Sequence, residues 1–201
     1  MILIGRFNSP FVRRVAISLH LLEIPFEHQP LSAIKEPDKV RVFNPLGRIP
    51  AVKLPDGEVL IDSNVILDHL DQLAGPERAL VPPVGPARQR VMGIIGFALG
   101  VMEKSLACYI ERKLRAEGTL DPGLLDRFVG QARAGLDALE AKAGDGWMCE
   151  GRLTQADISS VVALEFLKLS WPDLLAEGSL PRLEALSRRA HDLPAFALTR
   201  P

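Results

Sequence analysis

The chain has 201 residues, 47% of them hydrophobic, so it can bury one large core or two small ones without disulfide bonds. Its 24 Lys and Arg residues balance 25 Asp and Glu residues and form no basic tract, which argues against a nucleic-acid partner. Cys108 and Cys149 have neither CxxC spacing nor a histidine pair nearby, so we expect reduced thiols and no metal site.

The first third of the chain alternates between strand and helix patterns. Residues 1–5 predict a strand, residues 10–23 a helix with one apolar face, and residues 24–29 a second strand. Residues 32–43 predict a weak helix or an irregular crossover, which Pro37 interrupts.

A hairpin and another helix follow. Strands at 51–54 and 58–61 flank Pro55-Asp56-Gly57, in which proline presets the first φ and glycine accepts a positive one. Asp62-Ser63 then supplies the capping chemistry for a helix that stops at Gly75-Pro76.

The rest of the chain is predicted to be helical. Residues 87–116 and 122–143 predict two long helices, and Thr154-Gln155-Ala156-Asp157 resembles a capping box for the next one. The helices expected from there on cover 158–169, 173–177 and 180–191.

The change from mixed to helical patterns predicts two domains. We place an α/β domain at 1–75, an all-helical domain at 87–201, and a stiff, exposed, proline-rich linker at 76–86. The longest apolar run, 91–102, contains three glycines and is shorter than the roughly 18 residues that a membrane span needs. We therefore expect a soluble, cytoplasmic protein that does not associate with membranes.

Ser9 is the first candidate for chemistry because it precedes Pro10 at the junction of the first strand and helix. Free backbone N–H groups at a helix N-terminus stabilise an anion or a thiolate. A serine hydrolase is the competing interpretation. Ser9 lacks the G-x-S-x-G elbow, however, and no histidine stands out in triad order.

Two further motifs expose backbone groups. A proline that enters a strand forfeits a ladder hydrogen bond, so Pro50 is either an ordinary trans proline at a strand start or follows a cis peptide bond that leaves the Ile49 N–H and C=O free. The residues on both sides of Ile49-Pro50 favour the cis form. Asp62 and Ser63 cap a helix whose remaining N–H groups favour a carboxylate, although plain capping stays an alternative.

Ser9-Pro10, Arg48-Ile49-Pro50-Ala51-Val52 and Asp62-Ser63, in that order, resemble the cytosolic glutathione transferases over nearly the whole chain. The pattern at 44–50 and the run at 62–66 are the most specific parts. The resemblance implies a thioredoxin-like N-terminal domain with a mixed four-stranded sheet and three helices, followed by an all-α domain. It also implies a bacterial, serine-type site, glutathione as co-substrate and a homodimer.

The resemblance assigns a role to each motif. The Ile49 backbone beside Pro50 pairs with the cysteinyl unit of glutathione. Ser63 and its neighbouring N–H bind the γ-glutamyl carboxylate, and Asp62 binds the γ-glutamyl amine. The glycyl carboxylate needs a cation, and the candidates are Arg48 and Lys35, with plain solvated surface as the alternative role for either. Phe11 completes the expected contacts.

Ser9 is expected to donate a hydrogen bond to the glutathione sulfur. A free cysteine thiol has a pKa of roughly 8.5. A charge-assisted hydrogen bond worth about 1.5 to 3 kcal/mol lowers that pKa by roughly one to two units. Ser9 thus stabilises the nucleophile without being covalently modified.

The expected activity is detoxifying conjugation of glutathione to a small hydrophobic electrophile, or peroxide reduction. Cysteine is absent at position 9, which excludes mixed-disulfide chemistry there, and the Ser-Ser-Cys motif of maleylacetoacetate isomerases is missing. The alternative is a glutathione-binding or scaffold protein with little catalysis. The second substrate is expected over Ser9, with walls from the long helix that carries Cys108 and Arg112, and with Trp171 nearby.

Overall fold

The computed structural model describes residues 1–176 and 178–201. It divides the chain into two compact units. The N-terminal unit comprises Met1–Pro83 together with His191–Pro201, and the helical unit comprises Val84–Ala190.

The last eleven residues group with the N-terminal unit, whereas the sequence placed them in the helical domain. Helix α8 (Pro194–Leu198) packs on α1 (Pro10–Leu21). Arg13 Nε of α1 donates a hydrogen bond to the Thr199 carbonyl oxygen at 3.1 Å, and Phe196 is fully buried. Such a short helix shows too few residues for a detectable apolar period in the sequence.

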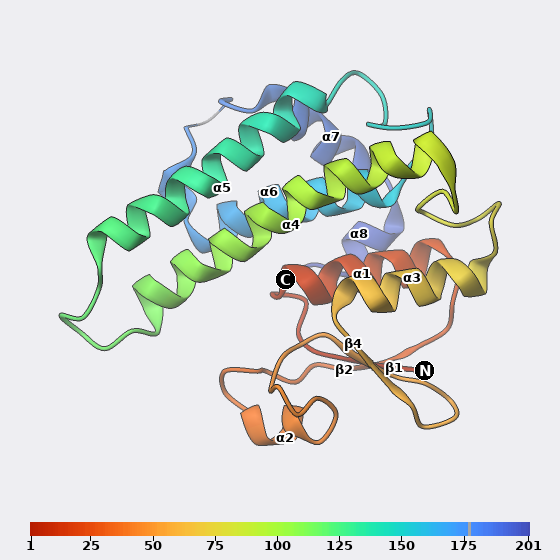
Figure 1. The fold of residues 1–201 in the computed structure, drawn as a ribbon, viewed down its shortest axis with the longest axis horizontal. Helices are drawn as coiled ribbons and strands as arrows, with labels where there is room; N and C mark the ends of the chain where they lie inside the picture. Colours follow the sequence, from red (N-terminus) through yellow and green to blue (C-terminus); the bar gives the residue numbers. More distant parts are fainter. Residues whose placement is uncertain (177) are drawn as a thin grey trace. The chain divides into compact units, whose positions relative to one another are not determined.

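The N-terminal unit is built on a mixed sheet in the order β2-β1-β3-β4. Its strands are β1 (Ile2–Ile4), β2 (Glu27–Gln29), β3 (Ala51–Lys53) and β4 (Val59–Ile61). Strand β1 is parallel to β2 and antiparallel to β3. Helix α1 and helix α3 (Ser63–Ala74) lie side by side on one face, and α2 (Pro37–Arg41) lies on the other (Figure 1). The thioredoxin-like unit predicted from the sequence is confirmed.

The strands are shorter than the sequence predicted, and within the predicted weak helix at 32–43 only residues 37–41 form α2. Pro37 begins α2 instead of interrupting it, because the first turn of a helix does not use the N–H that proline lacks. Val40 of α2 packs into a core with Ile4, Leu31 and Ala51. Asp62 caps α3 and Gly75 ends it, as predicted.

The helical unit contains two long helices, α4 (Gly85–Lys113) and α5 (Pro122–Lys142), and α4 packs along α5 and along α6 (Gln155–Ser170) (Figure 1). By length and composition alone α4 could cross a membrane, but core helices of soluble proteins satisfy the same criterion. The predicted helix at 173–177 corresponds to a 3-10 turn, η1, and Glu177 lies outside the described residues. The other helices are α6 (Gln155–Ser170), η1 (Pro172–Leu174) and α7 (Pro181–His191).

The predicted capping box at the start of α6 is confirmed, with Thr154 and Asp157 both fully buried. The Thr154 N–H and hydroxyl each donate to Asp157 Oδ2 at 2.8 Å. The Met148 N–H donates to Oδ1 at 2.7 Å, so Asp157 also holds the loop that precedes the helix.

Asp157→Ala is expected to lower the free energy of unfolding by about 2 to 3 kcal/mol, because it leaves two buried donors and one part-buried donor without their acceptor. Urea denaturation of the variant provides the measurement. Asp121→Ala is the matched control, since Asp121 is an exposed cap that accepts one bond from Leu124 N–H. If both variants lost the same free energy of unfolding, burial of the capping box would add nothing to its contribution to stability.

Candidate functional site

Ser9 lies at the N-terminus of α1, half-buried, in the extended conformation of a helix cap. Its Oγ accepts a long hydrogen bond of 3.4 Å from the Val12 N–H. Because the oxygen serves as acceptor there, the hydroxyl proton is left for another group, and it meets no acceptor among the described residues. Ser9 can therefore donate to an anion at the helix end.

The peptide bond between Ile49 and Pro50 is cis, as predicted. In the part of the chain that the structure describes, neither the N–H nor the C=O of Ile49 makes a hydrogen bond. Buried Asn44 fixes the preceding loop: its Nδ2 donates to the Arg48 carbonyl at 2.8 Å, and its Oδ1 accepts from the Leu46 N–H at 3.0 Å. The Asn44-Pro45 pair signals a turn in the sequence, but the pattern alone does not show that the Asn44 side chain holds it in place.

Gly5 lies between the two segments that carry Ser9 and Ile49. Its φ is +130°, and a Cβ there would lie 2.5 Å from Val12 Cγ2 and 2.9 Å from Ile49 Cβ. Only glycine fits this close approach. Gly5 thus sets how near the loop at Ile49 comes to the start of α1.

Asp62 and Ser63 begin α3, with Asp62 exposed and Ser63 buried. Asp62 has a positive φ of 69°, and its Oδ1 accepts from the Asn64 N–H at 2.8 Å. This capping bond is the plain role that the sequence allowed for the pair. It leaves the Ser63 N–H at the helix N-terminus, where an anion is favoured.

Arg14 of α1 also contacts the N-terminus of α3, a role that the sequence pattern did not reveal. It is 1% exposed, and its Nη1 donates to Ser63 Oγ at 3.3 Å and to Asn64 Oδ1 at 3.1 Å. Burial lowers the pKa of Arg14 to about 10, while the nearby Asp62 carboxylate opposes that shift. The signal for this contact in the sequence was a charged arginine within the otherwise apolar stretch of α1.

The remaining predicted contacts are peripheral. Lys35 and Arg48 are exposed, and within the described residues neither side chain forms an ion pair. Phe11, in the first turn of α1, is half-buried. A cation for the glycyl carboxylate is therefore available at either position, and the choice between them stays a prediction.

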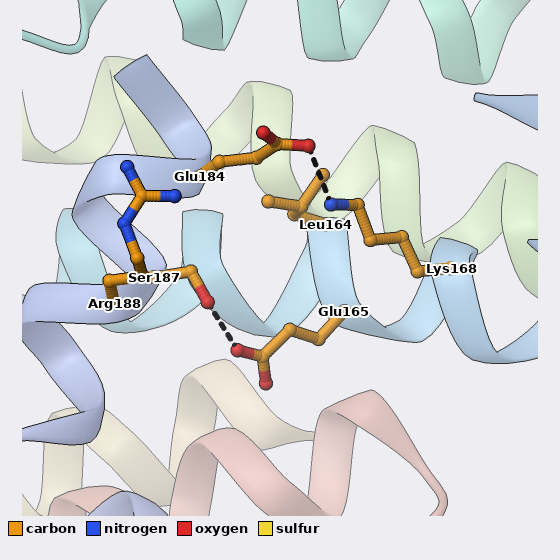
Figure 2. Close-up of a pocket in the computed structure, with 6 residues that line it drawn as sticks. All are labelled: Leu164, Glu165, Lys168, Glu184, Ser187 and Arg188. Atoms are coloured by element: carbon orange, nitrogen blue, oxygen red, sulfur yellow. Dashed lines mark hydrogen bonds and ion pairs between the residues drawn. The ribbon is translucent and has the colours of Figure 1, made fainter. Parts of the chain in front are cut away.

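Two features of the helical unit bear on a second substrate. The Arg112 guanidinium carbon lies 3.9 Å from the ring centroid of Trp171, a close cation–π stack one turn after Cys108. A separate hollow of about 320 Å³ lies between α6 and α7. Four of its polar side chains interact in pairs: Lys168 donates to Glu184, and the Ser187 hydroxyl donates to Glu165 (Figure 2).

The described residues contain no group of three or more His, Cys, Asp or Glu side chains arranged to hold a metal. Both cysteines are buried, and burial raises the pKa of each thiol. The Arg112 charge opposes this shift at Cys108, whereas the Asp157 and Glu150 charges add to it at Cys149.

Both thiols are therefore expected to react slowly in the folded protein. A raised pKa reduces the thiolate fraction near neutral pH, and only the thiolate attacks an alkylating reagent. Iodoacetamide labelling followed by mass spectrometry should give rates at least about tenfold lower in the native than in the urea-unfolded chain. Fast labelling of either cysteine in the native protein would show instead that its thiol is reactive.

Family models match most of the chain. One described as "Glutathione S-transferase, N-terminal domain" matches residues 3–78, and one described as "Glutathione S-transferase, C-terminal domain" matches residues 122–189. The maleylacetoacetate isomerase of Pseudomonas aeruginosa is 28% identical, covering 92% of this chain and 92% of that protein.

Solved structures are similar along the whole chain. A glutathione S-transferase from Methylobacterium radiotolerans, in complex with glutathione sulfonate, has a TM-score of 0.93 and 27% identity over 100% of this chain and 94% of that one. A glutathione transferase family member from Pseudomonas fluorescens Pf-5, with bound glutathione, has a TM-score of 0.85 and 33% identity over 100% of this chain and 98% of that one.

Proposed function

The chain belongs to the glutathione S-transferase family, and on that premise we propose that it binds glutathione and transfers its thiolate sulfur to a small hydrophobic electrophile. The observation that carries the proposal is the Ser9 hydroxyl at the N-terminus of the buried helix α1. Among the described residues this hydroxyl meets no hydrogen-bond acceptor. The relatives from M. radiotolerans and P. fluorescens, which hold glutathione sulfonate and glutathione, support the co-substrate.

Each predicted residue has a part in binding. The N–H and C=O of Ile49, which make no hydrogen bond among the described residues, pair with the cysteinyl unit as an antiparallel strand does. Ser63 and its N–H receive the γ-glutamyl carboxylate, and Asp62 receives the amine.

The far end of glutathione needs a cation and an apolar contact. Arg48 or Lys35 pairs with the glycyl carboxylate, and Phe11 packs beside the bound molecule. Both cations are exposed, so they contribute less binding free energy than the buried corner at Ser63.

Ser9 and the α1 N-terminus act on the sulfur. The hydroxyl donates to the thiolate, which lowers the thiol pKa and raises the fraction of nucleophile at neutral pH. The thiolate electron pair then forms the C–S bond while the leaving group departs with its own pair, or the pair adds to an activated double bond. No charge develops on Ser9 at any step.

The same thiolate can reduce an organic peroxide. Sulfur attacks one peroxide oxygen, the O–O bond breaks, and the alkoxide takes a proton. The resulting glutathione sulfenic acid reacts with a second glutathione to give the disulfide and water, so two thiols supply both electrons.

The helical domain contributes the electrophile site in this proposal, with Arg112 and Trp171 among its walls. We also propose that the protein is a cytoplasmic homodimer, as is usual for this family. The isomerase activity of the P. aeruginosa relative is not proposed, because Asn8-Ser9-Pro10 stands where that branch has two serines and a cysteine.

Two measurements test the proposal in sequence. Retention on immobilised glutathione, released by free glutathione, tests binding. Conjugation of a generic aryl halide and reduction of cumene hydroperoxide then test turnover. Binding with either activity supports a transferase, binding with neither favours a glutathione-binding scaffold, and no retention contradicts both.

A further inference from the structure

Arg14 carries a positive charge in a place where a charge is costly. It is fully enclosed between α1 and α3, and its Nε meets no acceptor among the described residues. Its hydrogen bonds go to neutral oxygens of Ser63 and Asn64, and no described carboxylate forms an ion pair with it. Removing an arginine from water without such a pair costs several kcal/mol.

The two hydrogen bonds of Arg14 determine what its partners can do next. A serine hydroxyl and an asparagine side chain can each donate or accept. Arginine only donates, so Ser63 Oγ and Asn64 Oδ1 are both committed as acceptors toward Arg14. The Ser63 O–H and the Asn64 Nδ2 group are left to act as donors at the N-terminus of α3.

The charge and the donors favour the same ligand. The α3 N-terminus already presents backbone N–H groups and the positive end of the helix dipole. A guanidinium held directly behind Ser63 adds a positive charge that little solvent screens. A carboxylate at this corner would receive the freed donors and offset the buried charge.

We propose that Arg14 is a positioning residue of the glutathione site: it orients Ser63 and Asn64 as donors and places a buried positive charge behind the γ-glutamyl carboxylate. The inference rests on the proposed function. Arg14 acts through Ser63 and does not itself touch glutathione. Its effect is therefore expected only for ligands that carry that carboxylate.

The test compares glutathione with γ-aminobutyryl-cysteinylglycine, which lacks only the γ-glutamyl carboxylate, by isothermal titration calorimetry. The wild type is expected to bind glutathione at least about tenfold more tightly than the analogue. In Arg14→Met this preference should fall by roughly tenfold, because glutathione loses affinity and the analogue does not.

Arg13→Met is the matched control. Arg13 is the adjacent residue of α1, is also buried, and donates to the Thr199 carbonyl instead of to α3. Its loss can lower stability, but the preference for glutathione over the analogue should stay at the wild-type value. Arg14→Lys, which keeps the charge but loses the planar fork, should retain part of the preference.

The outcomes separate the inference from the proposed function. If wild type binds glutathione and Arg14→Met weakens both compounds equally, Arg14 is only structural. Equal binding of both compounds to the wild type would also overturn its role. If wild type binds neither compound, the proposed function fails and the inference fails with it. Should Arg14→Met not fold, an unchanged preference in Arg14→Lys would count against the inference.

Discussion

Replacing Ser9 with alanine is expected to lower the conjugation rate by roughly 10- to 100-fold, with little change in glutathione affinity. This holds at any pH below the pKa of the glutathione thiol bound to the wild type. In our proposal the hydroxyl stabilises the thiolate and not the neutral thiol, so its loss should raise the thiol pKa by roughly one to two units. The thiolate fraction falls by the same factor. At high pH, where the thiol ionises unaided, the conjugation rates of the wild type and the variant should converge.

The pH dependence of kcat/KM measures this shift, and two variants separate the hydroxyl from the helix cap. Ser9→Thr keeps both the hydroxyl and the capping oxygen, so it should retain most activity. Ser9→Gly caps nearly as well as serine but has no hydroxyl, so it should behave like Ser9→Ala. If the pH profile of Ser9→Ala matched the wild type, Ser9 would have no role in thiolate stabilisation.

Gly5→Ala is expected to lower the free energy of unfolding by about 3 to 5 kcal/mol, the largest stability effect that we predict. The new Cβ would lie 2.5 Å from Val12 Cγ2 and 2.9 Å from Ile49 Cβ. The second atom is attached directly to the backbone, so it can retreat only if the Ile49 segment moves. Glutathione affinity should fall as well, because the Ile49 backbone is proposed to pair with the cysteinyl unit.

Gly57→Ala controls for the backbone conformation. Gly57 has a φ of +94° in the hairpin turn, and a Cβ there would meet nothing within 4 Å. Its loss should cost only the local strain of about 1 to 2 kcal/mol, without an effect on glutathione binding. Urea denaturation and calorimetry on both variants provide the comparison. If both variants lost the same free energy of unfolding, the close approach of Gly5 to Val12 and Ile49 would not add to the cost of a Cβ there.

The sequence predicted the parts of the candidate site that local chemistry determines. The Asp62 cap depends on neighbouring residues, and so do the Pro-Asp-Gly turn and the Thr154 capping box. The cis bond before Pro50 needed the additional pattern of residues around it. The order of the predicted strands and helices followed from periodicity, although their limits moved and residues 172–174 form only a 3-10 turn. Helix α8 was not predicted.

The contacts that the sequence missed join segments far apart in the chain. Arg14 reaches Ser63 across 49 positions, and Arg13 reaches Thr199 across 186. Both arginines lie on a helix that is buried on nearly every side, so periodicity alone could not show which of them meets α3. The tight fit of Gly5 against Ile49 likewise depends on how two segments pack.

The ionisation of glutathione on the protein tests the central claim most directly. The ultraviolet absorbance of the thiolate, measured as a difference spectrum while pH is varied, gives the pKa of the bound thiol. We expect the thiol of bound glutathione to have a pKa roughly one to two units below that of free glutathione. In Ser9→Ala the pKa of the bound thiol should return to the free value. A bound thiol that titrates as free glutathione does in the wild type would contradict the account.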